Sequence, residues 1–135
     1  NKYSFEATKY ILKKTDEFCK ANGKELMLVH FDPTNVFREM VVGNKRFDQE
    51  IMDFIRDNDY RYFDMNKVHL DDFKKFNLSL DEYMERYFIG HYTPSGNHFF
   101  AYSIKDKIVE WLDPKPITYQ QNDDKLIRFK GYLPK

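Results

Sequence analysis

The sequence predicts an α/β domain that contains a short, mostly parallel β-sheet with helices packed on its faces. Two short segments, residues 26–31 and 60–65, have the length and composition of strands, and each follows a segment whose apolar residues recur at helical spacing. This alternation of helix and strand is typical of sheets whose parallel strands are joined by crossover helices. We therefore expect a three-layer α/β sandwich.

The first helix and the first strand have clear end signals. Ser4 can cap a helix over about residues 5–22, and Gly23 suits the left-handed position that ends a helix. The mostly apolar run 26–31 stops at Asp32-Pro33, which predicts a strand buried on both faces of the sheet. Helical spacing then recurs, before the second strand, at Phe47, Ile51, Phe54 and Ile55.

The next part of the chain is predicted to be helical. Residues 71–76 suit a helical turn, and Ser79 with Glu82 forms the capping-box pattern that starts a helix. A long helix should follow over about residues 94–112, before the prolines of segment 113–116. Its inward face would carry Phe100, Ile104, Ile108 and Trp111.

The C-terminal residues are predicted to form a β-hairpin. Segments 117–120 and 126–132 have strand composition and flank the turn-forming sequence Asn122-Asp123-Asp124. We therefore expect an α/β domain over residues 1–116 and a hairpin extension over residues 117–135.

Composition argues against two classes of partner. The 135 residues include 22 Lys and Arg and 22 Asp and Glu, so no net charge attracts nucleic acid. No apolar stretch is long enough to cross a bilayer, and we expect no membrane partner. The single Cys19 cannot form an internal disulfide or a cysteine zinc site. These features leave the cellular compartment open.

The segment Gly-His-Tyr-Thr-Pro-Ser-Gly-Asn-His-Phe-Phe-Ala at residues 90–101 places a histidine on a short loop that leads directly into a helix. Thr93 can cap that helix, and Pro94 suits its first position. His91 therefore lies at the edge of the helix. A loop histidine that is held by rigid neighbours can expose one ring nitrogen while the other is oriented by the protein, as a general base requires.

This segment resembles the C-terminal histidine block of the SGNH/GDSL hydrolases, His-x-x-x-x-Gly-x-x-x-hydrophobic-Ala, here carried by His91, Gly96, Phe100 and Ala101. Over about residues 5–112, the order of elements is also similar to the second half of that flavodoxin-like fold. The resemblance implies a serine ester hydrolase that needs no cofactor, cleaves esters of lipids, carbohydrates or small alcohols, and uses His91 as general base.

Asp32 and Asp64 are possible neighbours of this site. Each aspartate lies at or near the carboxyl end of a predicted strand, where parallel sheets bind ligands. Helix capping and turn formation are the other interpretation of both residues, and for each residue taken alone that interpretation is favoured.

Two motifs of the family are missing from the chain. None of its five glycines is followed by Asp-Ser, and neither Asn-Asp pair, at 58–59 and 122–123, has the glycine of a Gly-x-Asn-Asp block. Phe88 occupies the position, three residues before His91, where the family has an orienting aspartate. The chain thus resembles only the C-terminal portion of such a hydrolase. We expect it to be inactive alone, because it lacks a nucleophile and oxyanion-hole donors.

Two other functions stay open. The chain could be a non-catalytic α/β binding or interaction protein that uses the same fold. It could also be a metal-dependent enzyme that uses its histidines, but none of their spacings is that of a known metal motif, so we predict no metal site. The candidate ligands are His30, Asp32, His69, His91 and His98.

We also expect a two-fold homodimer. If half of a doubly wound fold is missing, the strands over 26–31 and 60–65 lose the neighbours that would cover their edges, and an uncovered strand can pair with another chain. A net charge of zero opposes association little.

Overall fold

The computed structural model describes residues 2–112. Its elements are α1 (Lys2–Ala21), β1 (Met27–His30), the π-helical turn η1 (Pro33–Phe37), α2 (Arg38–Val41), α3 (Gln49–Asp57), β2 (Arg61–Asp64), α4 (Met65–Phe73), α5 (Leu80–Tyr87) and α6 (Pro94–Leu112). The chain divides into two compact units, Asn1–Lys105 and Asp106–Lys135. The predicted hairpin over 117–135 and the boundary at 116 lie outside the described residues.

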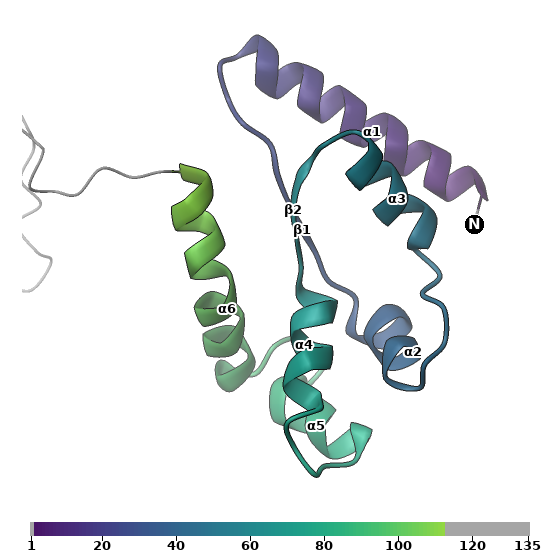
Figure 1. Cartoon of the computed structure of the whole chain (residues 1–135), viewed down its shortest axis with the longest axis vertical. Helices are drawn as coiled ribbons and strands as arrows, with labels where there is room; N and C mark the ends of the chain where they lie inside the picture. Colours follow the sequence, from purple (N-terminus) through teal and green to yellow (C-terminus); the bar gives the residue numbers. More distant parts are fainter. Residues whose placement is uncertain (1, 113–135) are drawn as a thin grey trace, which may run out of the picture. The chain divides into compact units, whose positions relative to one another are not determined.

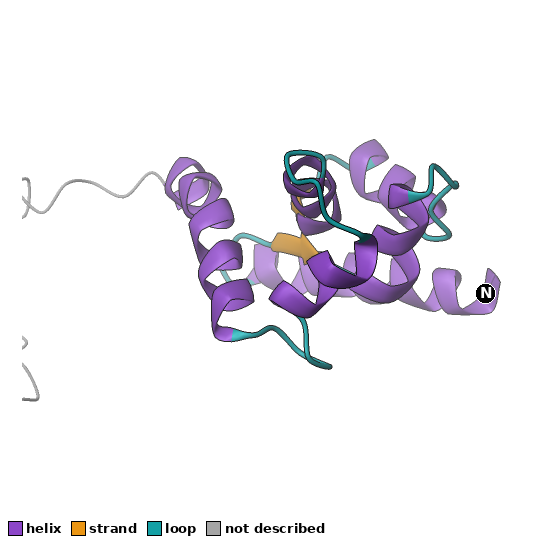
Figure 2. Ribbon diagram, turned by 90° about the horizontal axis from the view of Figure 1, so that it is seen from below, coloured by secondary structure: helices purple, strands orange, loops and turns teal. Residues whose placement is uncertain are grey.

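Over residues 2–112 the molecule is an α/β protein with two strands. β1 and β2 run parallel, with Leu28 opposite Tyr62 and His30 opposite Asp64 (Figures 1 and 2). The connection between them contains η1, α2 and α3, so the strands are joined by a helical crossover, as the sequence predicts. Because the strands are parallel, both end at the same edge of the sheet.

One face of the sheet is covered by α1 and α3. Leu28 and Tyr62 pack on the buried side of α3, which is formed by Ile51, Met52 and Ile55. The prediction that the first strand is buried on both faces is wrong, since Val29 is 46% exposed. Side chains alternate between the faces of a strand, and within residues 2–112 only two strands form the sheet, so Val29 lacks the cover that Leu28 receives.

Three helical segments differ from the sequence prediction. α1 begins at Lys2, so Ser4 lies within this helix and does not cap it. Residues 33–41 form η1 and α2, where no element was predicted, because Asp32 caps the turn by accepting from the backbone N–H groups of Thr34 and Asn35. Met65 opens α4 instead of ending a strand, and the helical turn predicted over 71–76 is the end of this longer helix, which stops at Phe73. Asp64 starts α4 by accepting from the N–H of Asn66.

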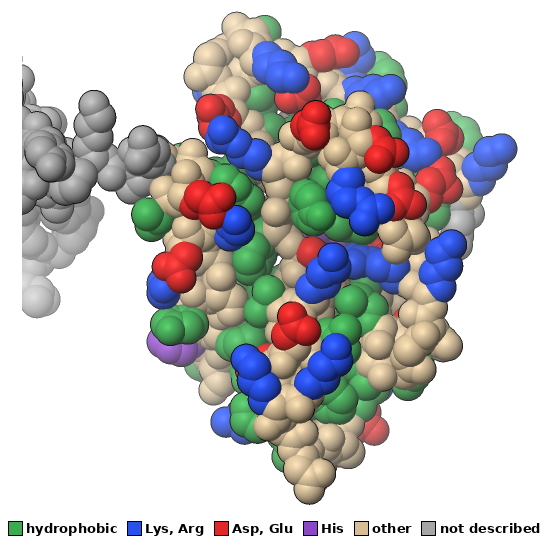
Figure 3. Space-filling model, viewed as in Figure 1, with side chains coloured by type: hydrophobic (Ala, Val, Ile, Leu, Met, Phe, Trp, Pro, Cys, Tyr) green, Lys and Arg blue, Asp and Glu red, His purple; other side chains and the backbone are tan. Residues whose placement is uncertain are grey.

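A second core cluster holds α5 against the segment after β1. Its fully or nearly fully buried members are Phe37, Tyr83, Met84 and Tyr87. The capping box of Ser79 and Glu82 is confirmed, and α6 has the predicted bounds. No helix within residues 2–112 is long and apolar enough to span a membrane. On the face shown in Figure 3, acidic and basic side chains are interspersed.

Candidate functional site

His91 lies on a tight turn between α5 and α6 that is fixed by backbone hydrogen bonds. Phe88 and Tyr92 form an antiparallel bridge, and the Ile89 N–H donates to the carbonyl of His91 over 2.8 Å. Gly90 adopts φ = 87°, in the left-handed region that favours glycine. The turn therefore presents His91 in a defined position at the surface.

The start of α6 secures the other side of this turn. Thr93 is the cap that the sequence predicts, because its Oγ1 accepts from the Gly96 N–H over 3.1 Å. The Thr93 hydroxyl also donates to the carbonyl of Arg86 over 3.0 Å. A Cβ at Gly96 would overlap the Tyr92 ring and the Tyr87 carbonyl, so only glycine allows this close approach.

The imidazole of His91 is oriented by its own loop. Its Nδ1 lies 2.9 Å from the carbonyl oxygen of Tyr92, and a carbonyl can only accept, so Nδ1 carries the proton. In the neutral ring Nε2 then keeps its lone pair, and His91 is exposed. Phe88 cannot replace an aspartate, because it has no carboxylate to accept a hydrogen bond from the imidazole. Its ring instead packs on the rings of Phe31 and Tyr92, with centroids 5.4 and 4.8 Å away.

Tyr92 anchors the loop to a buried histidine. The Tyr92 hydroxyl lies 2.8 Å from Nε2 of His69, and the Tyr83 hydroxyl lies 2.9 Å from Nδ1. In one consistent arrangement, the Tyr92 hydroxyl donates to Nε2 of His69, and the Nδ1–H of His69 donates to the Tyr83 hydroxyl. The hydroxyls of Tyr83 and Tyr87 can then both donate to Asp72, at 3.2 and 3.1 Å. Every group then has a partner while His69 is neutral. Burial lowers the pKa of His69 to about 4.

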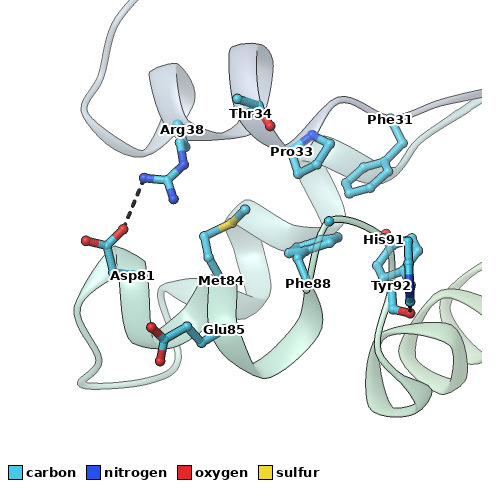
Figure 4. Close-up of a pocket in the computed structure, with 11 residues that line it drawn as sticks. Phe31, Pro33, Thr34, Arg38, Asp81, Met84, Glu85, Phe88, His91 and Tyr92 are labelled. Atoms are coloured by element: carbon cyan, nitrogen blue, oxygen red, sulfur yellow. Dashed lines mark hydrogen bonds and ion pairs between the residues drawn. The ribbon is translucent and has the colours of Figure 1, made fainter.

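A pocket of about 650 Å³ opens beside His91 (Figure 4). Phe31, Pro33 and Thr34, which directly follow β1, form part of its wall. His91 therefore shares the pocket with residues from the carboxyl edge of the sheet. The rings of Phe31, Phe88 and Tyr92 lie at the His91 end of the pocket in Figure 4, whereas Arg38 and Asp81 form an ion pair of 3.1 Å at the other end.

Asp32 has a structural role in this arrangement. Its carboxylate accepts from the N–H groups of Thr34 and Asn35 at 3.0 and 2.8 Å. Burial alone would raise the pKa of Asp32, but these donors outweigh burial and lower it. The backbone N–H of Asp32 donates to the side chain of Asn66 over 3.0 Å. Asp32 thus shapes the segment that lines the pocket.

Asp64 belongs to a separate buried charge cluster. Its Oδ2 accepts from Arg46 over 2.5 Å, and Arg46 also binds both oxygens of Asp48, at 2.6 and 2.9 Å. Nε2 of His30 contacts the Asp48 carboxylate. Burial by itself raises the pKa of Asp48, yet Arg46 and His30 hold it well below its usual range. None of these residues lines the pocket of His91.

Two features around the site depend on contacts between distant residues and could not be predicted from the sequence. Arg46 and Asp48 carry no local pattern that indicates burial, because Asp64, which pairs with Arg46, and His30, which contacts Asp48, are both distant in the sequence. Asn66, which is fully buried, links Asp32 to Asp64 by bonding to both. The sequence placed Asp32 and Asp64 near His91; the structure joins the two aspartates through Asn66 and brings the segment after Asp32 to the pocket.

The histidines do not gather into a metal site. Within residues 2–112, no group of three or more His, Cys, Asp or Glu side chains could hold a metal ion. His69 has two tyrosine partners and His30 contacts Asp48, whereas His91 and His98 are exposed.

Comparisons with known proteins found no relative. No protein-family model, curated protein or solved structure matches the chain.

Proposed function

We propose that this chain is the histidine-bearing portion of an SGNH/GDSL-like serine ester hydrolase, with His91 as general base. The single observation that carries the proposal is the exposed His91 ring, whose Nδ1–H is bound by the Tyr92 carbonyl and which lines a pocket. This is the proton arrangement in which a histidine can accept a proton from a serine hydroxyl.

The position of the pocket supports the same proposal. It lies at the carboxyl edge of a parallel sheet, where α/β proteins bind ligands, and its aromatic wall beside His91 suits the apolar part of a small ester. In this proposal β1 and β2 are two strands of a larger three-layer sandwich. The remaining strands, the Gly-Asp-Ser nucleophile and the oxyanion donors would come from residues outside this chain. No cofactor takes part.

Hydrolysis by this chain alone is not part of the proposal. Ser4 lies in α1, Ser79 caps α5, and Ser95 and Ser103 lie in the first and middle turns of α6. None of these serines follows Gly-Asp. A base without an activated nucleophile and oxyanion donors lacks the components that carry acyl transfer.

One observation favours a second candidate, a non-catalytic α/β binding or interaction protein. Phe88 stands where the family's aspartate would orient the histidine, and it packs in an aromatic cluster with Phe31 and Tyr92. The loop would then be retained for this packing, and the pocket would bind a ligand without chemistry.

The test compares this chain alone with the same chain continued at its N-terminus by the residues encoded upstream of Asn1. We expect the chain alone to show no hydrolysis of 4-nitrophenyl acetate above the buffer rate and no labelling by a fluorophosphonate probe. The longer polypeptide should be labelled on a serine, and His91→Ala should lower its kcat/KM by about 10²- to 10⁴-fold. His98→Ala is the matched control, because His98 is also exposed on the same segment.

Three results would refute the proposal. Labelling of the chain alone would mean that it already contains a nucleophile. A longer polypeptide that is not labelled, or whose turnover survives His91→Ala, would exclude His91 as the base and favour the binding protein.

A further inference from the structure

The outer face of α1 carries a largely exposed apolar stripe. Tyr3, Tyr10, Ile11 and Phe18 are 89%, 62%, 61% and 61% exposed. With about 3.6 residues per turn, these four positions fall on one side of the helix together with Ala7 and Lys14. We call these six residues the outer stripe. α1 has its own inner face, formed in part by Phe5 and Leu12, which packs towards α3 (Figure 1).

We propose that the outer stripe is the interface of an antiparallel homodimer, in which α1 of one chain packs against α1 of a second copy. The stripe is symmetric about the bond between Tyr10 and Ile11. A two-fold axis through that point pairs Tyr3 with Phe18 of the second copy, Ala7 with Lys14, and Tyr10 with Ile11.

The sizes of the paired side chains fit this arrangement. The polar side chain in the stripe, Lys14, lies opposite its smallest residue, Ala7, which leaves room for the lysine stem to pack and for its ammonium group to reach water. The large aromatic side chains Tyr3 and Phe18 lie opposite each other at both ends. A second copy in the antiparallel orientation thus matches the stripe better than a surface without this symmetry.

The charges beside the stripe favour the same orientation. One border carries Lys2, Glu6, Lys13 and Glu17, in which the sign alternates along the helix. In an antiparallel pair this border faces its own copy, so that Lys2 lies near Glu17 and Glu6 lies near Lys13. In a parallel pair it would face the other border, where Ser4 and Thr15 carry no charge.

The interface would be small. Buried Tyr and Phe side chains each cover about 150–250 Å², so three exposed aromatic residues and Ile11 on each copy bury on the order of 1,000 Å² in total. This area is at the lower end of the range for specific interfaces, so we expect a weak dimer.

A membrane surface is the other kind of occupant that an exposed apolar stripe can have. The charges of α1 argue against it, because three of its five lysines are paired with acidic side chains of the same helix. Lys9 pairs with Glu6, Lys14 with Glu17, and Lys20 with Asp16. Acidic side chains beside the stripe would also be repelled by anionic lipids.

Sedimentation equilibrium of the full chain across the micromolar range tests the proposal. We expect twice the mass of one chain at the upper end, and we expect Ile11→Glu to weaken the association at least about tenfold. Val42→Glu is the matched control, since Val42 is 63% exposed but lies outside α1. Circular dichroism confirms that each variant is folded.

Cysteine crosslinking tests the orientation in a Cys19→Ser background. Ile11→Cys should form a disulfide between chains under oxidation, since position 11 lies beside the two-fold axis. Phe18→Cys should not, because the two copies of position 18 would be roughly 22 Å apart along the helices, far beyond disulfide reach.

Three outcomes would overturn the proposal. The first is a monomer at all concentrations. The second is a dimer that Ile11→Glu leaves intact, which would place the contact elsewhere, for example on the strand edges. The third is a monomer that co-sediments with vesicles of phosphatidylcholine and phosphatidylserine and loses this binding in Ile11→Glu. Crosslinking of Phe18→Cys as well as Ile11→Cys would contradict the antiparallel orientation.

Discussion

Acidification should destabilise this protein through His69, whose side chain is fully buried among aromatic rings. The unfolded chain binds a proton on this imidazole near pH 6.5, whereas burial lowers the pKa of the folded state to about 4. Stability is therefore fully present above about pH 6.5 and falls as the pH drops towards 4, because the unfolded state then binds more protons. A pKa difference of about 2.5, at about 1.4 kcal/mol per unit, gives a loss of roughly 3 kcal/mol.

Urea unfolding followed by circular dichroism at pH 7.5 and pH 4.5 measures this loss. The matched variant is His69→Phe, which fills the site with a ring that cannot titrate. We expect the variant to be less stable than the wild type at pH 7.5, because the Tyr83 and Tyr92 hydroxyls lose their partner. The difference should shrink by about 2–3 kcal/mol at pH 4.5. If both proteins lose the same stability between the two pH values, His69 is not the group responsible.

Two further substitutions test the packing around the site and the buried charge cluster. Gly96→Ala should lower the free energy of unfolding by about 1–3 kcal/mol, since the new methyl group would overlap the Tyr92 ring and the Tyr87 carbonyl. Ser95→Ala, on the same turn, should change it by less than about 0.5 kcal/mol. Equal effects of the two substitutions in thermal melts would contradict the close packing at Gly96. Arg46→Met should cost about 3–5 kcal/mol at pH 7, because it removes the guanidinium group that pairs with both buried carboxylates, Asp48 and Asp64. A loss below about 1 kcal/mol in urea unfolding would contradict this role of Arg46.

The parts of the fold that local signals specify were predicted from the sequence. α5 begins at a capping box, and α6 begins at Thr93 followed by proline; both signals lie within one helical turn. β1 was found because a short apolar run stops at Asp32-Pro33, and β2 was found because residues 60–65 have the composition of a strand. The segment of η1 was missed although Asp32-Pro33 is a start signal for a helix, since the same dipeptide also ends a strand.

The surroundings of the candidate site depend on contacts between distant residues, which a single sequence does not specify. His69 was a possible metal ligand by residue type, but its chemistry is set by Tyr83 and Tyr92 from later elements. Asp64 was a possible neighbour of His91, but Arg46 holds it in a different cluster. The position of His91 on a capped loop was predictable, because it depends only on residues next to it.

The catalytic proposal depends most directly on which nitrogen of His91 carries the proton. Two-bond ¹H–¹⁵N correlation spectra of the ¹⁵N-labelled chain, recorded at alkaline pH, report this for each histidine. The Tyr92 carbonyl bound to Nδ1 predicts that His91 is the Nδ1–H tautomer with an unprotonated Nε2, while exposed His98 serves as the reference for an imidazole in water. If His91 carries its proton on Nε2, it has no lone pair to offer at the pocket, and the proposal that it is a general base is contradicted.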